Sequence, residues 1–223
     1  MKKLYLVSTP IGNYDDITLR AIKVLNDVDF IICEEFKEAK RLLSHLKIDK
    51  ELVSLNEHNE EDSSLEIFNK IKEGKKAALI SDCGTPLFSD PGNLLVKMCI
   101  DNGIEIVSIP GANSLLPALI GAGFKIDKFY YAGWLSPKSD IRRKELLRLK
   151  NVKELIVIME TPYRLKTIMT DLSKTFGGLK QISIAFDLTL PTEKYYRGTI
   201  SDLLQLVIKD KLKGEFVIVI NNR

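Results

Sequence analysis

The sequence has no long hydrophobic run and no complete targeting segment. None of its uninterrupted apolar stretches approaches the roughly 18 residues that a membrane-spanning helix needs. The apolar stretch that begins at Leu4 ends before Ser8, Thr9 and Pro10, which makes it too short for the core of a secretory signal. We therefore expect a cytoplasmic protein with no membrane partner.

Cysteine and histidine are scarce. The 223 residues include only three cysteines, Cys33, Cys83 and Cys99, and two histidines, His45 and His58. None of them stand close enough together to suggest paired zinc ligands, and three scattered cysteines do not make a disulfide framework. We therefore expect neither a metal site nor a disulfide-stabilised fold.

Three common motifs of nucleotide and acyl chemistry are also missing. The sequence contains no G-x-G-x-x-G, no G-x-x-x-x-G-K-[ST] and no G-x-S-x-G. These absences disfavour a dinucleotide enzyme, a P-loop hydrolase and a serine hydrolase. A nucleoside-like ligand held by backbone groups remains compatible with the sequence.

The charge of the chain is divided unevenly. Hydrophobic residues make up 45% and charged residues 28%, as in an ordinary soluble globular protein, and the net charge is only +3. Residues 1–123 hold 14 basic and 19 acidic residues, a net charge of −5, whereas residues 124–223 hold 19 and 11, a net charge of +8. A basic half hints at a polyanionic partner, although a solvated basic face is the commoner explanation.

Hydrophobic periodicity predicts an α/β fold. Strands are expected at residues 4–8, 28–33, 52–55, 77–81, 104–109, 129–132, 155–159, 181–186, 193–197 and 215–220, and helices at 18–25, 38–46, 63–73, 93–102, 113–121, 139–150, 163–176 and 200–208. The alternation in the first half predicts a mainly parallel sheet covered on both faces, and the second half predicts a mixed sheet. Gly121, Gly123 and the charged residues 125–128 suggest two domains, 1–124 and 125–223.

Four loops in the first half are rich in glycine and proline. They are residues 8–13, 81–86, 89–92 and 109–114, and all but the third directly follow an expected strand. Any one of them could be an ordinary turn. Because ligands bind at the carboxyl ends of strands in open α/β sheets, several such loops together predict a ligand cleft.

These loops carry a specific resemblance that continues along essentially the whole chain. The motifs are Thr9-Pro10-Ile11-Gly12-Asn13, the 14 residues 79–92, Pro110-Gly111-Ala112-Asn113-Ser114, Gly133-Trp134-Leu135-Ser136-Pro137-Lys138, Glu160-Thr161-Pro162-Tyr163-Arg164 and Lys213-Gly214-Glu215-Phe216-Val217. They resemble the tetrapyrrole methylase superfamily. More narrowly, the chain is similar to a short member of the ribosomal RNA small subunit 2′-O-methyltransferase I family, without its C-terminal helical extension.

The resemblance implies two α/β domains with S-adenosylmethionine bound in a cleft between them, in a homodimer. Carried over residue by residue, it places twelve residues at the cofactor: Pro10, Ile11, Gly84, Thr85, Phe88, Ser114, Leu115, Glu160, Asp187, Gly214, Glu215 and Val217. Methyl transfer by in-line displacement depends mainly on holding donor and acceptor at attack distance. The implied chemistry therefore agrees with the missing motifs.

A basic segment adjoins the expected cleft. The resemblance places Lys138, Arg142 and Arg143 where they would meet RNA phosphate, although an amphipathic helix with a solvated basic face would look the same. Trp134 could stack on a base, but a place in the apolar core is the commoner role for such a residue. The implied partner is ribosomal RNA or the small ribosomal subunit.

The resemblance predicts 2′-O-methylation of a cytidine in small-subunit ribosomal RNA. Alternatives are methylation of another RNA, methylation of a small tetrapyrrole-like acceptor, or RNA binding without turnover. A 2′-hydroxyl is a poor nucleophile, so a general base would help. Asp16, Glu34 and His58 are candidates, and the sequence does not choose among them: Asp16 could instead cap a helix, and His58 could instead order its loop.

Overall fold

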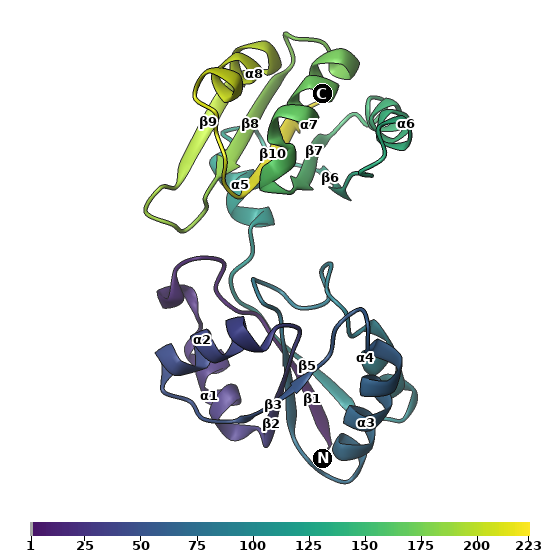
Figure 1. The fold of residues 1–223 in the computed structure, drawn as a ribbon. Coiled ribbons are helices and arrows are strands. Elements are labelled where there is room, and N and C mark those ends of the chain that lie inside the picture. The colour runs from purple at the N-terminus through teal and green to yellow at the C-terminus, as the bar shows by residue number, and fades with distance from the viewer. Residues whose placement is uncertain (1) are drawn as a thin grey trace. The chain divides into compact units, whose positions relative to one another are not determined.

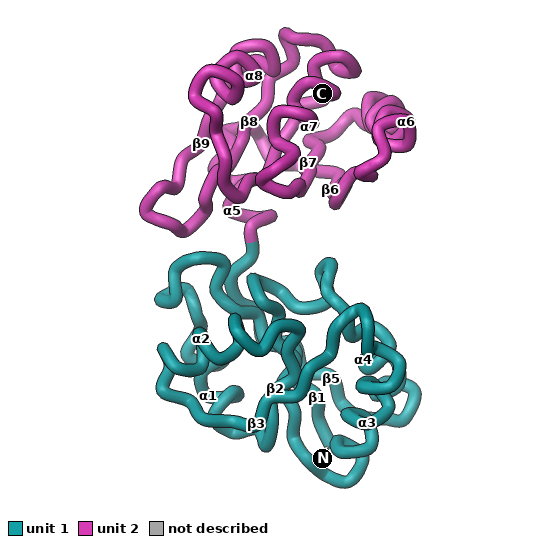
Figure 2. The backbone as a smooth tube through the Cα atoms, in the orientation of Figure 1, with its two compact units in different colours: residues 1–113 teal, residues 114–223 magenta. Residues whose placement is uncertain are grey.

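The first part of the chain alternates strands with helices, as its periodicity predicts. The computed structural model describes residues 2–223 and separates two compact units, 1–113 and 114–223 (Figure 2). Unit 1 contains β1 (Lys3–Val7), the 3-10 turn η1 (Tyr14–Asp16), α1 (Leu19–Asp27), β2 (Phe30–Cys33), α2 (Phe36–Leu46), β3 (Glu51–Ser54), α3 (Glu60–Lys72), β4 (Ala77–Ile80), α4 (Asn93–Asp101) and β5 (Glu105–Ile109).

The sheet of unit 1 is entirely parallel. Its strand order is β3-β2-β4-β1-β5, so β1 lies in the interior between β4 and β5. Helices α1 and α2 pack on one face through a core that includes Leu25 and Leu43, and α3 and α4 pack on the other through Ile67 and Leu95 (Figure 1). This doubly covered parallel sheet confirms the prediction for the first half of the chain.

Local signals fix several helix ends in unit 1. Thr18, rather than Asp16, is the N-cap of α1: its hydroxyl accepts a hydrogen bond from the backbone N–H of Ala21 at 3.1 Å. At the end of α3, Gly74 has φ +108°, a conformation that a side chain would strain. The helix predicted at residues 63–73 therefore ends within one residue of its predicted end.

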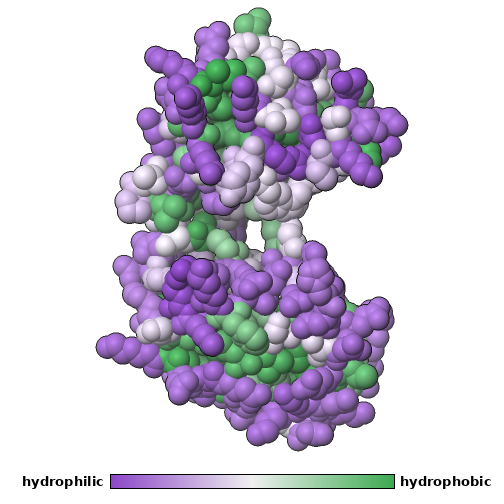
Figure 3. Space-filling view, viewed as in Figure 1, coloured by the Kyte–Doolittle hydropathy of each residue, from purple (hydrophilic) through white to green (hydrophobic). Residues whose placement is uncertain are grey.

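One surface of unit 1 has a groove beside the edge strand β3, lined by both apolar and polar side chains. A cavity of about 520 Å³ lies between α2 and β3, with Phe36, Leu43 and Leu52 among its lining residues. Figure 3 shows hydrophobic side chains gathered on this face of the unit. No helix within residues 2–223 is long and apolar enough to cross a membrane.

Unit 2 has a mixed sheet, as predicted. It contains α5 (Leu115–Gly121), β6 (Phe129–Trp134), α6 (Ser139–Leu149), β7 (Leu155–Glu160), the 3-10 turn η2 (Pro162–Arg164), α7 (Leu165–Phe176), β8 (Gln181–Phe186), β9 (Lys194–Thr199), α8 (Ile200–Lys209) and β10 (Phe216–Asn221). The strand order is β6-β7-β10-β8-β9, in which β6 and β7 are parallel and the other neighbours antiparallel.

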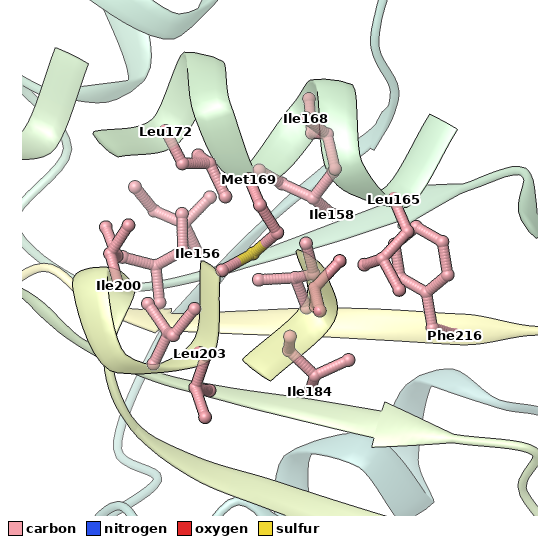
Figure 4. Close-up of a cluster of buried hydrophobic side chains, with 14 of the residues drawn as sticks. Ile156, Ile158, Leu165, Ile168, Met169, Leu172, Ile184, Ile200, Leu203 and Phe216 are labelled. Atoms are coloured by element: carbon pink, nitrogen blue, oxygen red, sulfur yellow. The ribbon is translucent and has the colours of Figure 1, made fainter. Parts of the chain in front are cut away.

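The core of unit 2 lies between one face of this sheet and helices α6, α7 and α8. Figure 4 shows Ile168, Met169 and Leu172 of α7 packing toward the strand residues Ile156 and Ile158. Because side chains alternate along a strand, the residues between these, such as Val157, face the opposite side of the sheet. Helix α5 packs on β8 and β10.

The boundary between the units differs from the predicted one. The sequence suggested a division between residues 124 and 125, whereas the structure divides at residues 113 and 114. Helix α5 is attached to unit 2 because the hydroxyl of Tyr195 donates to the carbonyl of Pro117 at 2.9 Å and the side chain of Arg197 donates to the carbonyl of Gly121. Glycines that resemble a linker therefore lie inside the second unit.

Candidate functional site

Three loops interlock at the carboxyl edge of the parallel sheet in unit 1. They follow β4, β1 and β5, which are neighbours in the sheet. The backbone N–H of Thr9 donates to the carbonyl of Gly84 at 2.8 Å, and the Thr9 hydroxyl donates to the carbonyl of Ser81 at 3.0 Å. The N–H of Ser8 donates to Ile109 at 3.2 Å. The strand order thus brings three of the four predicted loops together, at a position typical of ligand sites.

Gly84 is the point at which these loops approach most closely. Its φ of +89° lies in the left-handed region, and a Cβ atom there would lie 3.2 Å from Ile11 Cγ2 and 3.7 Å from the carbonyl oxygen of Ala112. Glycine is therefore required by both conformation and space. The N–H of Gly84 donates to the Thr9 hydroxyl at 3.1 Å, which fixes its direction.

Carboxylates gather at the same edge of unit 1. Burial raises the pKa of Glu34, Asp82 and Asp90, and the negative charges of Asp82 and Asp90 raise the pKa of Glu34 further. Asp82 also accepts a hydrogen bond from the backbone N–H of Glu35 at 3.2 Å. A cation beside these carboxylates would favour their charged forms.

The three candidates for a general base occupy different places in unit 1. Asp16 ends the exposed turn η1, and because Thr18 caps α1, Asp16 is not the helix cap. His58 lines an acidic cavity of about 570 Å³ with Glu57 and Glu60. Glu34 follows β2 directly, at the carboxyl edge of the sheet, and has a raised pKa.

The twelve residues expected at the cofactor are divided between the units. Pro10, Ile11, Gly84, Thr85 and Phe88 all lie in the interlocked loops of unit 1. The other seven lie in unit 2, including Ser114 and Leu115 at the start of α5, which the sequence assigned to the first domain.

One edge of the unit 2 sheet collects Asp187, Gly214 and Glu215. Asp187 follows β8 with φ +48°, and its Oδ1 accepts the backbone N–H of Glu215 at 3.0 Å. Its Oδ2 accepts the hydroxyl of Thr192 at 3.0 Å. A Cβ atom at Gly214 would clash with Asp187 and Phe186. Asp187 therefore holds the start of β10 against the end of β8.

Glu160 and Val217 face opposite sides of the same sheet. Val217 pairs with Met159, and Glu160 is the next residue of β7, so alternation turns its side chain toward the face covered by α7. The buried Glu160 Oε1 accepts the N–H of Thr161 at 2.9 Å. Its Oε2 lies 3.0 Å from Arg164 Nη2. The two groups form an ion pair, but their orientation does not make a hydrogen bond. Burial raises the pKa of Glu160.

The expectation that Arg142 meets RNA is wrong for its side chain as the structure places it. Arg142 is only 4% exposed, and its Nε donates to Asp171 Oδ2 at 2.8 Å. Its Nη1 donates at 2.9 Å to the carbonyls of both Ser136 and Pro137. The Nε and Nη1 groups of Arg142 are therefore used within the unit, and its side chain is buried. Lys138 and Arg143, the other two residues predicted to meet RNA, are exposed.

Arg164 was not assigned a role from the sequence, although it ends one of the motifs. Its Nη2 donates to the carbonyl of Ser136 at 2.9 Å and to that of Leu135 at 3.2 Å. Arg142 and Arg164 therefore hold the loop after β6 from two sides. The sequence signalled this residue only by an arginine four residues after the glutamate in the same motif. The carbonyls that Arg164 contacts lie about 28 residues away, so they could not be predicted.

The structure also corrects the expected place of Trp134. Its side chain is 44% exposed at the end of β6, and it does not belong to the apolar core of unit 2.

Among residues 2–223, no group of three or more histidine, cysteine, aspartate or glutamate side chains is arranged to hold a metal ion.

Comparison with known proteins identifies relatives along nearly the whole chain. The sequence model of the Tetrapyrrole (Corrin/Porphyrin) Methylases matches residues 3–204. The chain is 41% identical to the ribosomal RNA small subunit methyltransferase I of Bacillus subtilis over 97% of its own length and 74% of the relative's. It is 39% identical to the protein of that name from Thermotoga maritima over the whole of both chains.

The fold matches a solved enzyme at low sequence identity. Uroporphyrin-III C-methyl transferase from Thermus thermophilus, solved in complex with S-adenyl homocysteine, superposes with a TM-score of 0.69 at 16% identity. The match covers 98% of this chain and 96% of that one. At this identity the likeness concerns the fold alone.

Proposed function

The chain belongs to the tetrapyrrole (corrin/porphyrin) methylase family, and within it to the ribosomal RNA small subunit methyltransferase I family, so we propose that it methylates small-subunit ribosomal RNA. It is an S-adenosylmethionine-dependent methyltransferase. The observation that supports this acceptor most directly is the near-complete match to curated relatives of that name. The finer proposal is methylation of the 2′-oxygen of a cytidine.

The residues of unit 1 suit the proposed cofactor. S-adenosylmethionine carries a sulfonium cation beside a nucleoside, and it supplies an activated methyl group when bound. The loop around Gly84 can offer its backbone to a ligand, because a side chain at this position would be strained by the positive φ and crowded by Ile11. Glu34, Asp82 and Asp90, whose pKa values are raised by burial, supply negative potential at the same edge. Phe88, 44% exposed, offers an apolar surface.

We propose that residues of both units line the cofactor site, as the family resemblance implies. In unit 1 these are Pro10, Ile11, Gly84, Thr85 and Phe88. In unit 2, Asp187 orders the segment that contains Gly214 and Glu215 through a 3.0 Å hydrogen bond to the N–H of Glu215. The role of the chain is to hold donor and acceptor in line, which supplies most of the acceleration that a methyl transfer needs.

Glu34 is our candidate for the group that accepts the proton of the attacking hydroxyl. A general base works best when its pKa approaches the working pH. Burial and the neighbouring Asp82 and Asp90 shift the pKa of Glu34 in that direction. Asp16 and His58 remain the alternatives.

Mass mapping of ribosomal RNA tests the acceptor. RNA from a strain without this protein should lack one methyl group, and the purified protein with S-adenosylmethionine should restore it on small ribosomal subunits. An unchanged map would reject the ribosomal acceptor and leave another RNA, a tetrapyrrole-like acceptor or a protein without turnover. Calorimetry with S-adenosylmethionine then identifies a protein without turnover, because a methyltransferase must bind the cofactor.

We also propose that the protein is a cytoplasmic homodimer. Leu116 and Ile120 of α5 and Phe129 of β6 are large hydrophobic side chains exposed on unit 2. Exposed apolar side chains that come from adjoining segments favour a surface that another chain covers. Sedimentation of the purified protein should give the mass of two chains, and a monomer at micromolar concentration would contradict this proposal.

A further inference from the structure

Two aromatic side chains are exposed where strands of unit 2 end. Trp134 is the last residue of β6 and is 44% exposed, and Tyr163 follows β7 within η2 and is 81% exposed. Neither residue is absorbed by the core of the unit. Aromatic surfaces left open on a folded unit are typical of places that bind a flat partner.

The register of the sheet brings both residues to the same edge of the sheet. Strands β6 and β7 are parallel neighbours, and Trp134 pairs with Met159, four residues before Tyr163. Arg164, the residue after Tyr163, contacts the carbonyls of Leu135 and Ser136, which directly follow Trp134. The two aromatic residues therefore leave the sheet from adjacent strand ends.

A local irregularity in β6 sets the direction of Trp134. The register with β7 shifts between Tyr131 and Gly133, and Gly133 has φ +66°, which is a β-bulge immediately before Trp134. Bulges bend a strand and change the direction of the side chains that follow, and they are common beside functional sites.

Positive charge lies beside these rings. The Nζ of Lys213 stands 4.9 Å from the centre of the Tyr163 ring, in a cation–π contact. Lys213 precedes β10, whose first residue pairs with Glu160 at the end of β7, so it belongs to the same edge. Lys138 is exposed four residues after Trp134. Lysines interleaved with aromatic rings suit a strand of bases and phosphates.

The edge is held rigid before any ligand arrives. The carbonyl of Ser136 accepts hydrogen bonds from Arg142 and Arg164, both at 2.9 Å. Arg142 is in turn paired with Asp171 at 2.8 Å, and Arg164 with Glu160 at 3.0 Å. The buried Arg142 and the partly buried Arg164 hold the loop between Trp134 and Lys138. A loop that is ordered in advance loses less entropy when it binds a partner.

We infer that this edge binds an unpaired stretch of RNA, with bases stacked on Trp134 and Tyr163 and phosphates beside Lys138 and Lys213. The inference rests on the proposed function, because it assumes an RNA acceptor, and it adds that the strand must be single. Bases in a duplex are stacked on one another and do not offer their faces to side chains. Arg142 and Arg164 are positioning residues of this platform.

The single tryptophan of the chain makes the test direct. Trp134 fluorescence is followed while the full-length protein is titrated with oligocytidylate of roughly ten nucleotides, a length in the range of known single-strand sites. The control is an RNA duplex of the same length, titrated in a buffer of the same ionic strength. We expect the single strand to quench the indole emission through stacking and the duplex to leave it largely unchanged.

Substitutions at Tyr163 separate stacking from general attraction. Tyr163→Leu keeps an apolar residue but removes the ring, and it should weaken single-strand binding by roughly tenfold, the loss typical of one base–aromatic stack. Tyr163→Phe keeps the ring and should bind like the unchanged protein. Leu179→Ala, at a residue 86% exposed elsewhere on unit 2, is the matched control and should have no effect.

The outcomes are decisive in either direction. Equal quenching by duplex and single strand, or unchanged affinity of Tyr163→Leu, would overturn the platform. The assay needs neither the cofactor nor methyl transfer. A protein that methylates ribosomal RNA but fails this titration refutes only the platform, whereas a protein that passes it but leaves the methylation map unchanged refutes only the ribosomal acceptor.

Discussion

Arg142 and Arg143 are consecutive on α6 but have opposite surroundings. Arg142 is buried against Asp171, whereas Arg143 is exposed. We expect Arg142→Ala to lower the free energy of unfolding by about 3 kcal/mol, because it removes the ion-pair partner of Asp171 and the donor to the Pro137 carbonyl, and leaves the Ser136 carbonyl with Arg164 alone. Urea unfolding followed by circular dichroism measures this loss. Arg142→Lys keeps the charge but cannot reach both carbonyls at once. Its free energy of unfolding should lie between those of Arg142→Ala and the unchanged protein.

Arg143→Ala is the matched control variant. It should affect RNA binding rather than stability. Its stability should stay within about 0.5 kcal/mol of the unchanged protein. Its affinity for RNA should fall, and the slope of log affinity against log salt should decrease by about one. Comparable loss of stability in both variants would mean that α6 supports the unit along its whole surface.

The carboxylates of unit 1 predict a pH dependence that distinguishes two ligands. The pKa values of Glu34, Asp82 and Asp90 are raised, so these groups become protonated at a higher pH than ordinary carboxyl groups do as the pH falls. Protonation removes their attraction for a sulfonium. The affinity for S-adenosylmethionine should therefore decrease on acidification, by up to about tenfold per pH unit for each proton bound.

S-adenosylhomocysteine is the control for that measurement. It lacks the sulfonium charge but keeps the nucleoside, so calorimetry across the same pH window should show a weaker dependence. Parallel curves for the two ligands would place the carboxylates away from the sulfur.

Single side chains were the hardest part of the site to predict from the sequence. The glycine and proline loops were found because their residue types restrict the backbone wherever they occur. The burial of Arg142 could not be found, since its partner Asp171 is 29 residues away and the local pattern of α6 is that of a basic solvated helix. Glu160 is a similar case, because its direction depends on the register of β7 with β10.

Helix α5 is held to unit 2 by a close contact at one glycine. A Cβ atom at Gly121 would clash with the ring of Tyr195, whose hydroxyl donates to the carbonyl of Pro117 at 2.9 Å. We expect Gly121→Ala to destabilise unit 2 by about 1–3 kcal/mol, as overpacking usually does. Thermal unfolding measures the change. Tyr195→Phe removes only the hydrogen bond and should cost about 1 kcal/mol.

Elements were predicted better than their assignment to units. The strand and helix ranges follow from periodicity and from caps such as Thr18, which act within a few residues. The position of α5 depends instead on Tyr195 and Arg197, more than seventy residues later in the chain. A short apolar helix followed by Gly121 and Gly123 looks the same whether it ends one unit or begins the next.

Unit 2 should fold without unit 1. It has its own core between the sheet and helices α6, α7 and α8, and α5 packs on the strands β8 and β10. We expect residues 114–223 to unfold cooperatively and to bind single-stranded RNA, but to bind S-adenosylmethionine weakly because the loops of unit 1 are missing. A fragment of residues 125–223 begins at the boundary predicted from the sequence and lacks α5. It should aggregate or unfold at a lower urea concentration than residues 114–223, because Val217 and Val219 lose the helix that packs on their strand.

The charge division follows the boundary that the structure shows. Residues 114–123 hold no charged side chain, so unit 1 has the same net charge of −5, and unit 2 the same +8, as the halves compared in the sequence. An acidic unit repels RNA, while a basic unit attracts it. Long-range attraction should therefore orient the RNA toward unit 2 and weaken as salt is added.

The strand order of unit 1 also bears on how the chain is made. Strand β1 is synthesised before the other strands of its sheet, yet its two neighbours in the sheet are β4 and β5, which end at residues 80 and 109. Until those residues emerge, β1 has both edges unpaired, whereas β2 and β3 can already associate. Because pairing over such separations is slow, the nascent first unit stays open to chaperones and proteases until β5, which ends at residue 109, has emerged.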